Sequence, residues 1–439
     1  MHSLAEQLNK TIYRENPNIF AMLSKLGKEI YFPKVGILNQ SAEAKKKASK
    51  FNATIGIALE NGEPMHLDVF QQNLSAYSPK DLYPYAPPAG KPELRSLWRE
   101  KLLEESPSLK EKTFSLPVVT NALTHGLSIA ADLFADEGDS VILPDKNWEN
   151  YELTFGVRRG AEIATYAFFN ENGGFNAEGL RQTILNQKEK GKAIVLLNFP
   201  NNPTGYTPNK EEAAQITAAI EEGAKEGIKL VVITDDAYYG LFFENSLKES
   251  LFSELSNIHP NVLALKVDGS TKEDYVWGFR VGFLTFGAES EELLQALEQK
   301  TLGIIRAATS SGSHPSQTFV LEAMKSPEYK KQKEEKFEVM KRRANKVKAL
   351  LDSGKFESAW EYYPFNSGYF MCLKLKTANA EKVRTLLLEE YGIGTIALGQ
   401  SDLRVAFSCI EEEDLEELYT LIYEAAKKVE EQQKEALEK

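Results

Sequence analysis

The sequence predicts an α/β fold in which a large, doubly wound and mostly parallel sheet is joined to a smaller α+β part. Four short apolar runs support this prediction, because strands that are covered on both faces read as nearly unbroken apolar segments. These runs are residues 140–144, 193–197, 229–233 and 262–265. Helix-like stretches lie between them, such as 209–226, where apolar residues recur at spacings of roughly 3.6 residues. This alternation of strands and helices is typical of a doubly wound sheet.

The region after the last of these runs changes to a helical and strongly charged pattern. Residues 291–350 carry this pattern, with a break near Gly312 and Pro315, and we expect a long connecting helix there. Residues 411–439 place several leucines on one helical side and then become almost entirely polar. We therefore expect a packed C-terminal helix with a frayed end.

Two further strand-like runs, 368–373 and 402–407, flank the helical stretch 380–391. This pattern predicts a small α+β domain near the C-terminus. We accordingly expect a large domain of residues 66–325, and a small domain that combines an N-terminal arm and segment, 1–65, with 326–439.

Composition and charge restrict the classes of function. Of 439 residues, 42% are hydrophobic and 26% are charged, which is typical of a globular protein with a large core. The net charge of −12 opposes binding to nucleic acid or to anionic lipid. No apolar stretch approaches the roughly 18 residues of a membrane span. Two cysteines supply no disulfide framework, and the N-terminus lacks an apolar signal core, so we expect a cytoplasmic protein without nucleic-acid or membrane partners.

Several common catalytic templates are absent from the sequence. It contains no GxxxxGK[ST], no GxGxxG after a strand, no GxSxG and no HExxH motif. Its five histidines show no metal-ligand spacing, so we expect no metal site. These absences disfavour a nucleotide-binding protein and a histidine-centred hydrolase.

Polar residues follow three of the predicted strands, at the end where open α/β sheets bind their ligands. They include Asn202, Asp235, Tyr238, Lys272 and, eight residues after that lysine, Arg280. Pyridoxal phosphate needs a lysine for a Schiff base, a carboxylate facing the pyridine nitrogen, donors near the ring oxygen and a cationic cradle for phosphate. Each requirement has a candidate among these five side chains.

In their order and spacing these motifs resemble the class I aminotransferases of the fold type I pyridoxal phosphate enzymes, in particular the aspartate and aromatic amino acid aminotransferases. The resemblance covers roughly residues 50–410. It implies that Asn202 and Tyr238 bond the ring oxygen and that Asp235 pairs with the ring nitrogen. It also implies that Lys272 forms the Schiff base and that Arg280 binds the phosphate.

The same resemblance places the phosphate loop at the start of a helix, where anions bind well. Ala122, Leu123 and Thr124 are the expected contacts, although the family often has glycine where Ala122 stands. Trp148 resembles the aromatic residue that stacks on the cofactor ring. Tyr85 resembles a tyrosine that reaches the phosphate of the neighbouring subunit, which implies a homodimer with shared active sites.

One position departs from the family pattern. Three residues before the lysine, where the family usually has a phosphate-binding serine, this chain has Gly269. We expect Ser270 to supply the missing hydroxyl, and Thr271 is the alternative.

Three further residues concern the substrate. Gly56 lies in a segment that resembles the one closing over bound substrate. Arg404 matches the arginine that clamps the substrate α-carboxylate, because a planar guanidinium binds a carboxylate through two bonds. Arg306 resembles the partner-subunit arginine that binds the distal carboxylate of aspartate or glutamate.

The resemblance implies an aminotransferase that moves an amino group between an L-amino acid and a 2-oxo acid such as 2-oxoglutarate. Aspartate or glutamate is the expected donor, and an aromatic donor stays open. Two alternatives remain: a β-eliminating lyase or synthase on the same fold, and a non-catalytic regulator that binds pyridoxal phosphate. The regulator would need a basic DNA-binding module, and neither end of the chain resembles one.

Overall fold

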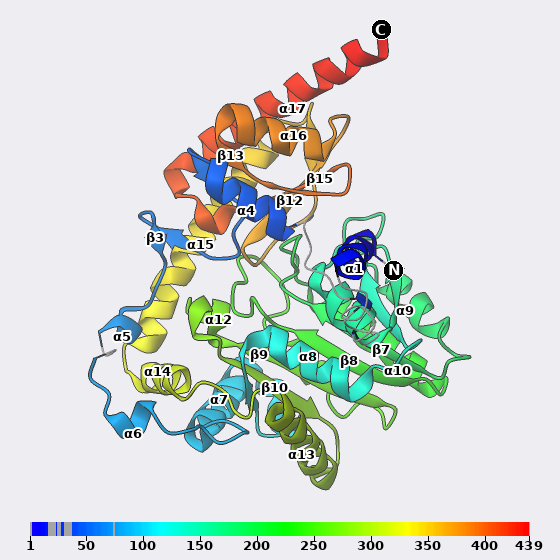
Figure 1. Cartoon of the computed structure of the whole chain (residues 1–439), viewed down its shortest axis with the longest axis vertical. Coiled ribbons are helices and arrows are strands. Elements are labelled where there is room, and N and C mark those ends of the chain that lie inside the picture. Colours follow the sequence, from blue (N-terminus) through cyan, green and yellow to red (C-terminus); the bar gives the residue numbers. More distant parts are fainter. Residues whose placement is uncertain (1, 16–22, 24–27, 30–36, 73–74, 439) are drawn as a thin grey trace.

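Seven strands form one large sheet in the computed structural model, which describes residues 2–15, 23, 28–29, 37–72 and 75–438 (Figure 1). Across the sheet they are β4 (Val118–Thr120), β10 (Gly282–Gly287), β9 (Val262–Gly269), β8 (Lys229–Asp235), β7 (Lys192–Asn198), β5 (Ser140–Pro144) and β6 (Glu162–Tyr166). Only β10 runs against its neighbours in this described sheet. The predicted doubly wound, mostly parallel sheet is confirmed.

Helices cover this sheet. They are α7 (Pro92–Glu105), α8 (Ala122–Phe134), α9 (Ala177–Leu185), α10 (Lys210–Lys225), α11 (Leu251–Leu255) and α13 (Glu291–Ala308). Of these, α9, α10, α11 and α13 each begin at a residue whose side chain caps the helix. Asn209 caps α10, because its side chain accepts a hydrogen bond from the Glu212 amide. The Glu212 carboxylate in turn accepts a hydrogen bond from the Asn209 backbone amide, which completes a capping box. The helix then buries Ala213, Ile216 and Ile220 against its neighbours.

Strand β9 is longer than the sequence pattern predicts. We expected it to end at residue 265, but it continues through two charged residues to Gly269. Lys266 forms a buried ion pair with Asp236 of the adjoining chain segment, and the Trp98 indole donates to Asp268 Oδ2 at 3.0 Å. Charged residues are tolerated inside this strand because each has a polar or charged partner. The pattern of apolar residues in the sequence does not reveal these partners.

A second, antiparallel sheet of four strands forms near the C-terminal end. In order they are β11 (Trp360–Tyr362), β12 (Phe370–Leu375), β15 (Asp402–Ala406) and β14 (Ile396–Leu398). Helices α16 (Ala380–Leu386), which continues as the π-helical turn η4 (Leu387–Tyr391), and α17 (Leu415–Glu438) accompany it. The end of α17 that we expected to fray is helical to Glu438.

An N-terminal segment joins this second sheet region. Strand β1 (Phe51–Asn52) pairs in parallel with β13 (Ile393–Gly394), and α4 (Ile37–Lys47) packs against β13 and β14. Figure 1 shows α4 beside the C-terminal elements although it lies far from them in sequence. The domain limits at residues 66 and 325 stay a prediction, and part of the expected N-terminal arm lies outside the described residues.

The single long helix expected in residues 291–350 is instead three helices. They are α13, α14 (His314–Lys325) and α15 (Tyr329–Asp352). The Ser313 side chain accepts a hydrogen bond from the Ser316 amide and so caps α14, directly after the predicted break at Gly312. In Figure 1, α15 extends from beside α14 to the region of the second sheet.

Short elements complete the described chain. They are α1 (Ser3–Glu15), β2 (Leu59–Glu60), β3 (Glu63–Pro64), α5 (Asp68–Gln71), α6 (Pro79–Leu82), η1 (Pro107–Glu111), η2 (Glu152–Val157), α12 (Ser270–Glu273), η3 (Trp277–Phe279), η5 (Phe407–Cys409) and η6 (Glu412–Asp414). In the part of the chain that the structure describes, every helix is too short or too polar to span a lipid bilayer.

Two glycines allow the ends of β9 and β10 to approach each other closely. Gly269 pairs with Gly282, and a Cβ atom on Gly269 would lie 2.6 Å from the Val281 carbonyl oxygen. A Cβ atom on Gly282 would lie 2.6 Å from the backbone of Ala122, at the start of α8. The backbone spacing therefore explains why this position, where the family that the sequence resembles usually has serine, is occupied by Gly269.

We predict that Gly269→Ser destabilises the fold and does not restore a useful hydroxyl group. Overpacking against backbone atoms should lower the free energy of unfolding by roughly 1 to 3 kcal/mol, measured by urea denaturation. Gly278→Ser is the control, because a Cβ atom there meets no described heavy atom within 4 Å. Equal stability of the two variants would contradict this explanation.

Candidate active site

A cavity of about 330 Å³ lies at the carboxyl ends of the strands in the large sheet. Both sheet regions and the N-terminal segment contribute to its wall. The structure brings together most of the predicted site residues here, namely Gly56, Ala122, Leu123, Thr124, Trp148, Asn202, Asp235, Tyr238, Lys272, Arg280 and Arg404. Its volume lies within the usual range of small-molecule sites, roughly 300 to 1,000 Å³.

Asp235 is held at the end of β8 by three hydrogen bonds. The Tyr151 hydroxyl donates to Asp235 Oδ2 at 2.7 Å, and the Ala237 amide donates to Oδ1 at 3.2 Å. The Asn198 side chain donates to the Asp235 carbonyl at 2.9 Å. Burial raises the pKa of Asp235 to about 6, although the Tyr151 bond and the Lys272 charge act in the opposite direction. The carboxylate is thus fixed in position and poorly solvated.

Lys272 lies on α12, the short helix that follows β9. Its Nζ is 5.0 Å from the centroid of the Tyr238 ring, and the Tyr369 hydroxyl donates to its carbonyl at 3.2 Å. Burial lowers the pKa of Lys272 to about 8; the Asp235 charge raises it and the Arg280 charge lowers it further. Roughly a tenth of this amine is therefore neutral, and so nucleophilic, at pH 7, far more than of an ordinary lysine with a pKa of about 10.4.

The adjacent Asp236 has a different environment. Its carboxylate forms the buried ion pair with Lys266 and accepts a hydrogen bond from the Ser250 hydroxyl at 2.5 Å. It does not line the cavity. The structure thus separates the two aspartates, with Asp235 facing the cavity and Asp236 anchored beneath it.

The start of α8 and Arg280 form a cradle suited to an anion. Ala122 has a φ of 66° and Arg280 a φ of 54°, both in the left-handed region. For residues other than glycine this conformation costs roughly 1 to 2 kcal/mol each, and such strain is typical of functional sites. Ala122 therefore adopts a backbone conformation that glycine adopts most readily. Arg280 lines the same cavity and is exposed to solvent, and its partial desolvation lowers the pKa of its guanidinium.

Ser270 and Thr271 differ in whether they line the cavity. The Ser270 side chain is fully buried with its hydroxyl 3.5 Å from the Val281 carbonyl, and it is not among the cavity residues. Thr271 lines the cavity. The Thr271 hydroxyl also lies 3.4 Å from the Val281 carbonyl, but of the two residues only Thr271 lies on the cavity wall, so the structure favours the alternative residue over Ser270.

Arg404 on β15 is a buried cation on the cavity wall. Its Nη1 donates to Asn202 Oδ1 and its Nη2 to the Thr54 carbonyl, each at 2.9 Å, while its guanidinium lies 4.2 Å from the centre of the Phe370 ring. Among the described residues, its Nε has no hydrogen-bond partner and no carboxylate lies within ion-pair distance. A buried guanidinium without an anion is prepared to receive a carboxylate.

Tyr85 and Arg306 lie outside the cavity of their own chain. The Tyr85 side chain is 91% exposed on the loop before α7. Arg306 is exposed near the end of α13, where it donates to the Ser310 hydroxyl. This chain alone does not bring these two predicted residues to the site.

Sequence reasoning missed several residues of the site. Tyr151, Asn198, Thr54 and Phe370 all line the cavity, and the first two hold Asp235. Tyr151 was detectable, since it follows Trp148 by one helical turn, and the two rings meet edge to face at 5.6 Å. Thr54 contributes its carbonyl, and no side-chain motif marks such a contact.

The charges of the cavity favour an anionic ligand. Lys272, Arg280 and Arg404 face it, with Asp235 as the opposing carboxylate. A phosphate suits Arg280 and the first turn of α8, and a carboxylate suits Arg404. A protonated ring nitrogen suits Asp235.

Comparison with known proteins identifies the family. The model of the family "Aminotransferase class I and II" matches residues 54–422. The chain belongs to this family. A probable aspartate/prephenate aminotransferase of Aquifex aeolicus is 27% identical over 342 residues, which are 75% of this chain and 80% of that protein. An aspartate aminotransferase of Bacillus sp. (strain YM-2) is 24% identical over 295 residues, 65% of this chain and 68% of the relative.

Solved structures agree on the fold of this aminotransferase. An aminotransferase from Anaerococcus prevotii has a TM-score of 0.81 at 24% identity, covering 92% of this chain and 98% of that one. An aspartate aminotransferase from Thermus thermophilus with maleate has a TM-score of 0.73 at 18% identity, covering 92% and 99%. At these identities the likeness concerns the fold alone.

The predicted aminotransferase class and the predicted cofactor are confirmed by family membership. This aminotransferase depends on pyridoxal phosphate, as its family does. The cavity residues fit that cofactor, because they offer a lysine, a carboxylate, an anion cradle and an aromatic ring in Trp148.

The two aspartates should respond oppositely to removal of their charge in the cofactor-free protein. Asp235 has a folded-state pKa of about 6, above its ordinary value near 4, so folding binds a proton and stability falls as pH rises across this window. Asp235→Asn should remove that fall and stabilise the protein by roughly 1 to 3 kcal/mol at pH 7. Asp236→Asn should destabilise it by roughly 3 to 5 kcal/mol, because Lys266 loses its partner.

Denaturant unfolding from about pH 4 to pH 7 measures both effects. The stability advantage of Asp235→Asn over the unaltered protein should grow across this range. An advantage that stays constant with pH would show that Asp235 does not titrate there.

Proposed function

We propose that this aminotransferase moves an amino group between aspartate, glutamate or an aromatic L-amino acid and a 2-oxo acid such as 2-oxoglutarate. The observation that carries the proposal is Arg404, a buried guanidinium with an unpaired Nε and no carboxylate partner among the described residues. Amino acids and 2-oxo acids share the α-carboxylate that would satisfy it. Relatives named as aspartate or aspartate/prephenate aminotransferases support the range of donors.

Pyridoxal phosphate, when bound, holds the amino group and accepts the electron pair left at the substrate Cα when its proton is removed. Lys272 would hold the cofactor covalently, Asn202 and Tyr238 would bond its ring oxygen, and Trp148 would cover its ring. Ala122, Leu123, Thr124, Thr271 and Arg280 would bind its phosphate. Asp235 would keep the ring nitrogen protonated.

The protein's own groups then perform the proton transfers. Arg404 fixes the substrate carboxylate, and Gly56 lies on the wall of the same cavity. Lys272 Nζ, once free, takes the proton from the substrate Cα and returns it to the cofactor, which is general acid–base catalysis. Burial favours this role, because it lowers the pKa of Lys272 to about 8.

We further propose that two chains share each active site. Tyr85 would reach the phosphate of the partner's cofactor, and Arg306 would bind the distal carboxylate of a dicarboxylic substrate. Their exposure in a single chain supports this assignment, because a large tyrosine that is 91% exposed gains from burial at an interface. We place the enzyme in the cytoplasm, in keeping with two buried cysteines that form no disulfide.

The direct test of the proposed function is a screen of amino acids with 2-oxoglutarate. Each donor is mixed with the holoenzyme, and the cofactor absorbance change reports the half-reaction. Glutamate formed from 2-oxoglutarate supports transfer to this acceptor. Ammonia and pyruvate in place of a new amino acid would contradict the proposal.

We expect Lys272 to be the covalent attachment point of the cofactor. Borohydride reduction of the holoenzyme, followed by peptide mapping, should place the label on Lys272, and Lys272→Ala should abolish turnover. Lys266 is the internal control: it is also buried but is engaged by Asp236. A label on Lys266 or on another lysine would refute the assignment.

Arg306→Ala should lower kcat/KM for aspartate or glutamate far more than for an uncharged donor. Loss of a charge pair with the distal carboxylate is worth on the order of 2 to 5 kcal/mol in kcat/KM. Lys300→Ala removes another exposed charge of the same helix and should leave both donors unaffected. Equal losses for both donor types would shift the proposal to a neutral or aromatic substrate.

A further inference from the structure

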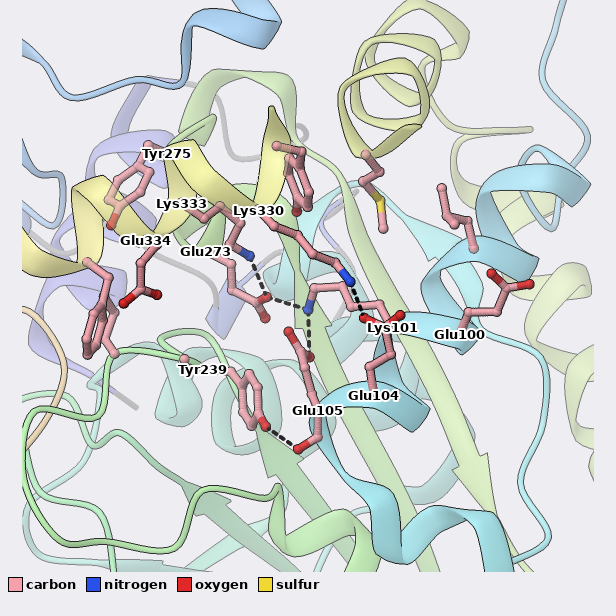
Figure 2. Close-up of a pocket in the computed structure, with 16 residues that line it drawn as sticks. Glu100, Lys101, Glu104, Glu105, Tyr239, Glu273, Tyr275, Lys330, Lys333 and Glu334 are labelled. Carbon is pink, nitrogen blue, oxygen red and sulfur yellow. Dashed lines mark hydrogen bonds and ion pairs between the residues drawn. The ribbon is translucent and has the colours of Figure 1, made fainter. Parts of the chain in front are cut away.

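A second cavity, of about 570 Å³, lies behind the active site and is larger than it (Figure 2). We call it the rear pocket; α7, α12, α14, α15 and residues 239–241 form its walls. Two pairs of sequence neighbours separate the cavities. Tyr238 and Lys272 line the active site, whereas Tyr239 and Glu273, the next residues, line the rear pocket.

The lysines of the rear pocket already have anionic partners. Lys101 Nζ lies 2.8 Å from Glu105 and 2.7 Å from Glu273, and Lys330 Nζ lies 2.8 Å from Glu104. Lys333 Nζ lies 3.1 Å from Asp274 and 3.9 Å from Glu273. Figure 2 shows Lys101 and Lys333 directed at the Glu273 carboxylate. These cations are therefore not available to bind an anionic ligand.

Some carboxylate groups of the rear pocket remain without a full set of partners after these ion pairs are formed. The Glu273 side chain is 1% exposed, and within the described chain its Oε1 has no hydrogen-bond partner. Burial raises the pKa of Glu273, and the adjacent Lys101 and Lys333 charges oppose that rise and favour the carboxylate form. At the rim, Glu100 and Glu334 are exposed, and no ion pair engages either of them in the described ranges. The pocket carries more negative charge than its own lysines neutralise.

The remaining wall is apolar and aromatic. Leu97, Met324 and Phe337 offer aliphatic and aromatic surface, and the rings of Tyr239 and Tyr329 lie nearby. Aromatic faces attract cations, by roughly 0.5 to 2 kcal/mol for each favourable contact. An apolar wall with surplus carboxylates suits a ligand that has an alkyl or aryl body and one positive charge.

We propose that the rear pocket binds a small organic cation, a protonated amine with a short apolar body, whose positive charge faces Glu100 and Glu334 at the rim and the Glu273 carboxylate in the wall. Glu273 lies next to Lys272 on α12, and Tyr239 lies next to Tyr238. A ligand held there contacts the backbone that positions both active-site residues, so it acts as an effector of amino transfer.

The test uses the holoenzyme and N,N-dimethylhexylamine. This tertiary amine is protonated near neutral pH and cannot condense with the cofactor, which separates the rear pocket from amine chemistry in the active site. Isothermal titration calorimetry should show saturable binding of one molecule per chain. Hexanoate and 1-hexanol, which share the apolar body but lack the positive charge, should bind at least tenfold more weakly, because a charged hydrogen bond is worth about 1.5 to 3 kcal/mol.

Variants of the pocket localise the binding. Glu334→Gln should weaken it by about threefold, as expected for an exposed charge. Glu335→Gln, the adjacent exposed glutamate that does not line the pocket, should leave it unchanged. Glu273→Gln should weaken binding at least tenfold. If that variant does not fold, Met324→Trp, which fills the pocket from α14, should abolish binding instead.

Three results would overturn the proposal. These are the absence of saturable binding, equal affinity for hexanoate, and affinities for the amine that are the same in Glu334→Gln, Met324→Trp and the unaltered enzyme. Binding that depends on Glu334 but leaves kcat and KM unchanged would contradict the effector role.

Discussion

The buried ion pair between Asp236 and Lys266 is the interaction on which the geometry of the active site depends. It joins the end of β8 to β9, and these two segments carry Asp235 and Lys272 into the cavity. Its desolvation is costly, but it also leaves little freedom at the strand ends, since each partner would be a bare buried charge if the other moved away. Asp235 and Lys272 therefore do not need a direct bond to remain in place.

The same two segments bury charged groups whose burial opposes folding. Burial raises the pKa of Asp235 and lowers the pKa of Lys272, so each group would be more stable in water in its charged form. Ala122 and Arg280 add left-handed backbone in the same place. The large apolar core and the anchored neighbours offset these costs, and the resulting site is rich in positive charge.

Residues that are adjacent in the sequence have side chains in different environments. Asp235, Tyr238 and Lys272 face the catalytic cavity, while the residues that follow them face buried ion pairs or the rear pocket. Helix α15 passes along that pocket and continues to the second sheet region, where Arg343 donates to the Ser408 carbonyl at 2.6 Å. The walls of the rear pocket therefore include the segment that carries Lys272 and a helix, α15, that also contacts the part of the chain carrying Arg404.

The sequence by itself determined the fold class, most of the strands and the chemistry of the site. Strands that are buried on both faces of a sheet consist of nearly unbroken apolar residues, as in 193–197 and 229–233. Such runs can be recognised in the sequence alone. The order and spacing of Asn202, Asp235, Lys272 and Arg280 were equally visible, because each follows a strand end.

Only the tertiary structure decided which of two neighbouring groups meets the cavity. It placed Thr271 there in preference to Ser270, and it explained Gly269 by the Val281 carbonyl 2.6 Å from any Cβ atom at that position. It also extended β9 through Lys266, whose partner lies 30 positions away in the chain. The physical reason is common to these cases: steric contact and charge pairing act between segments that are distant in sequence, so no local pattern records them.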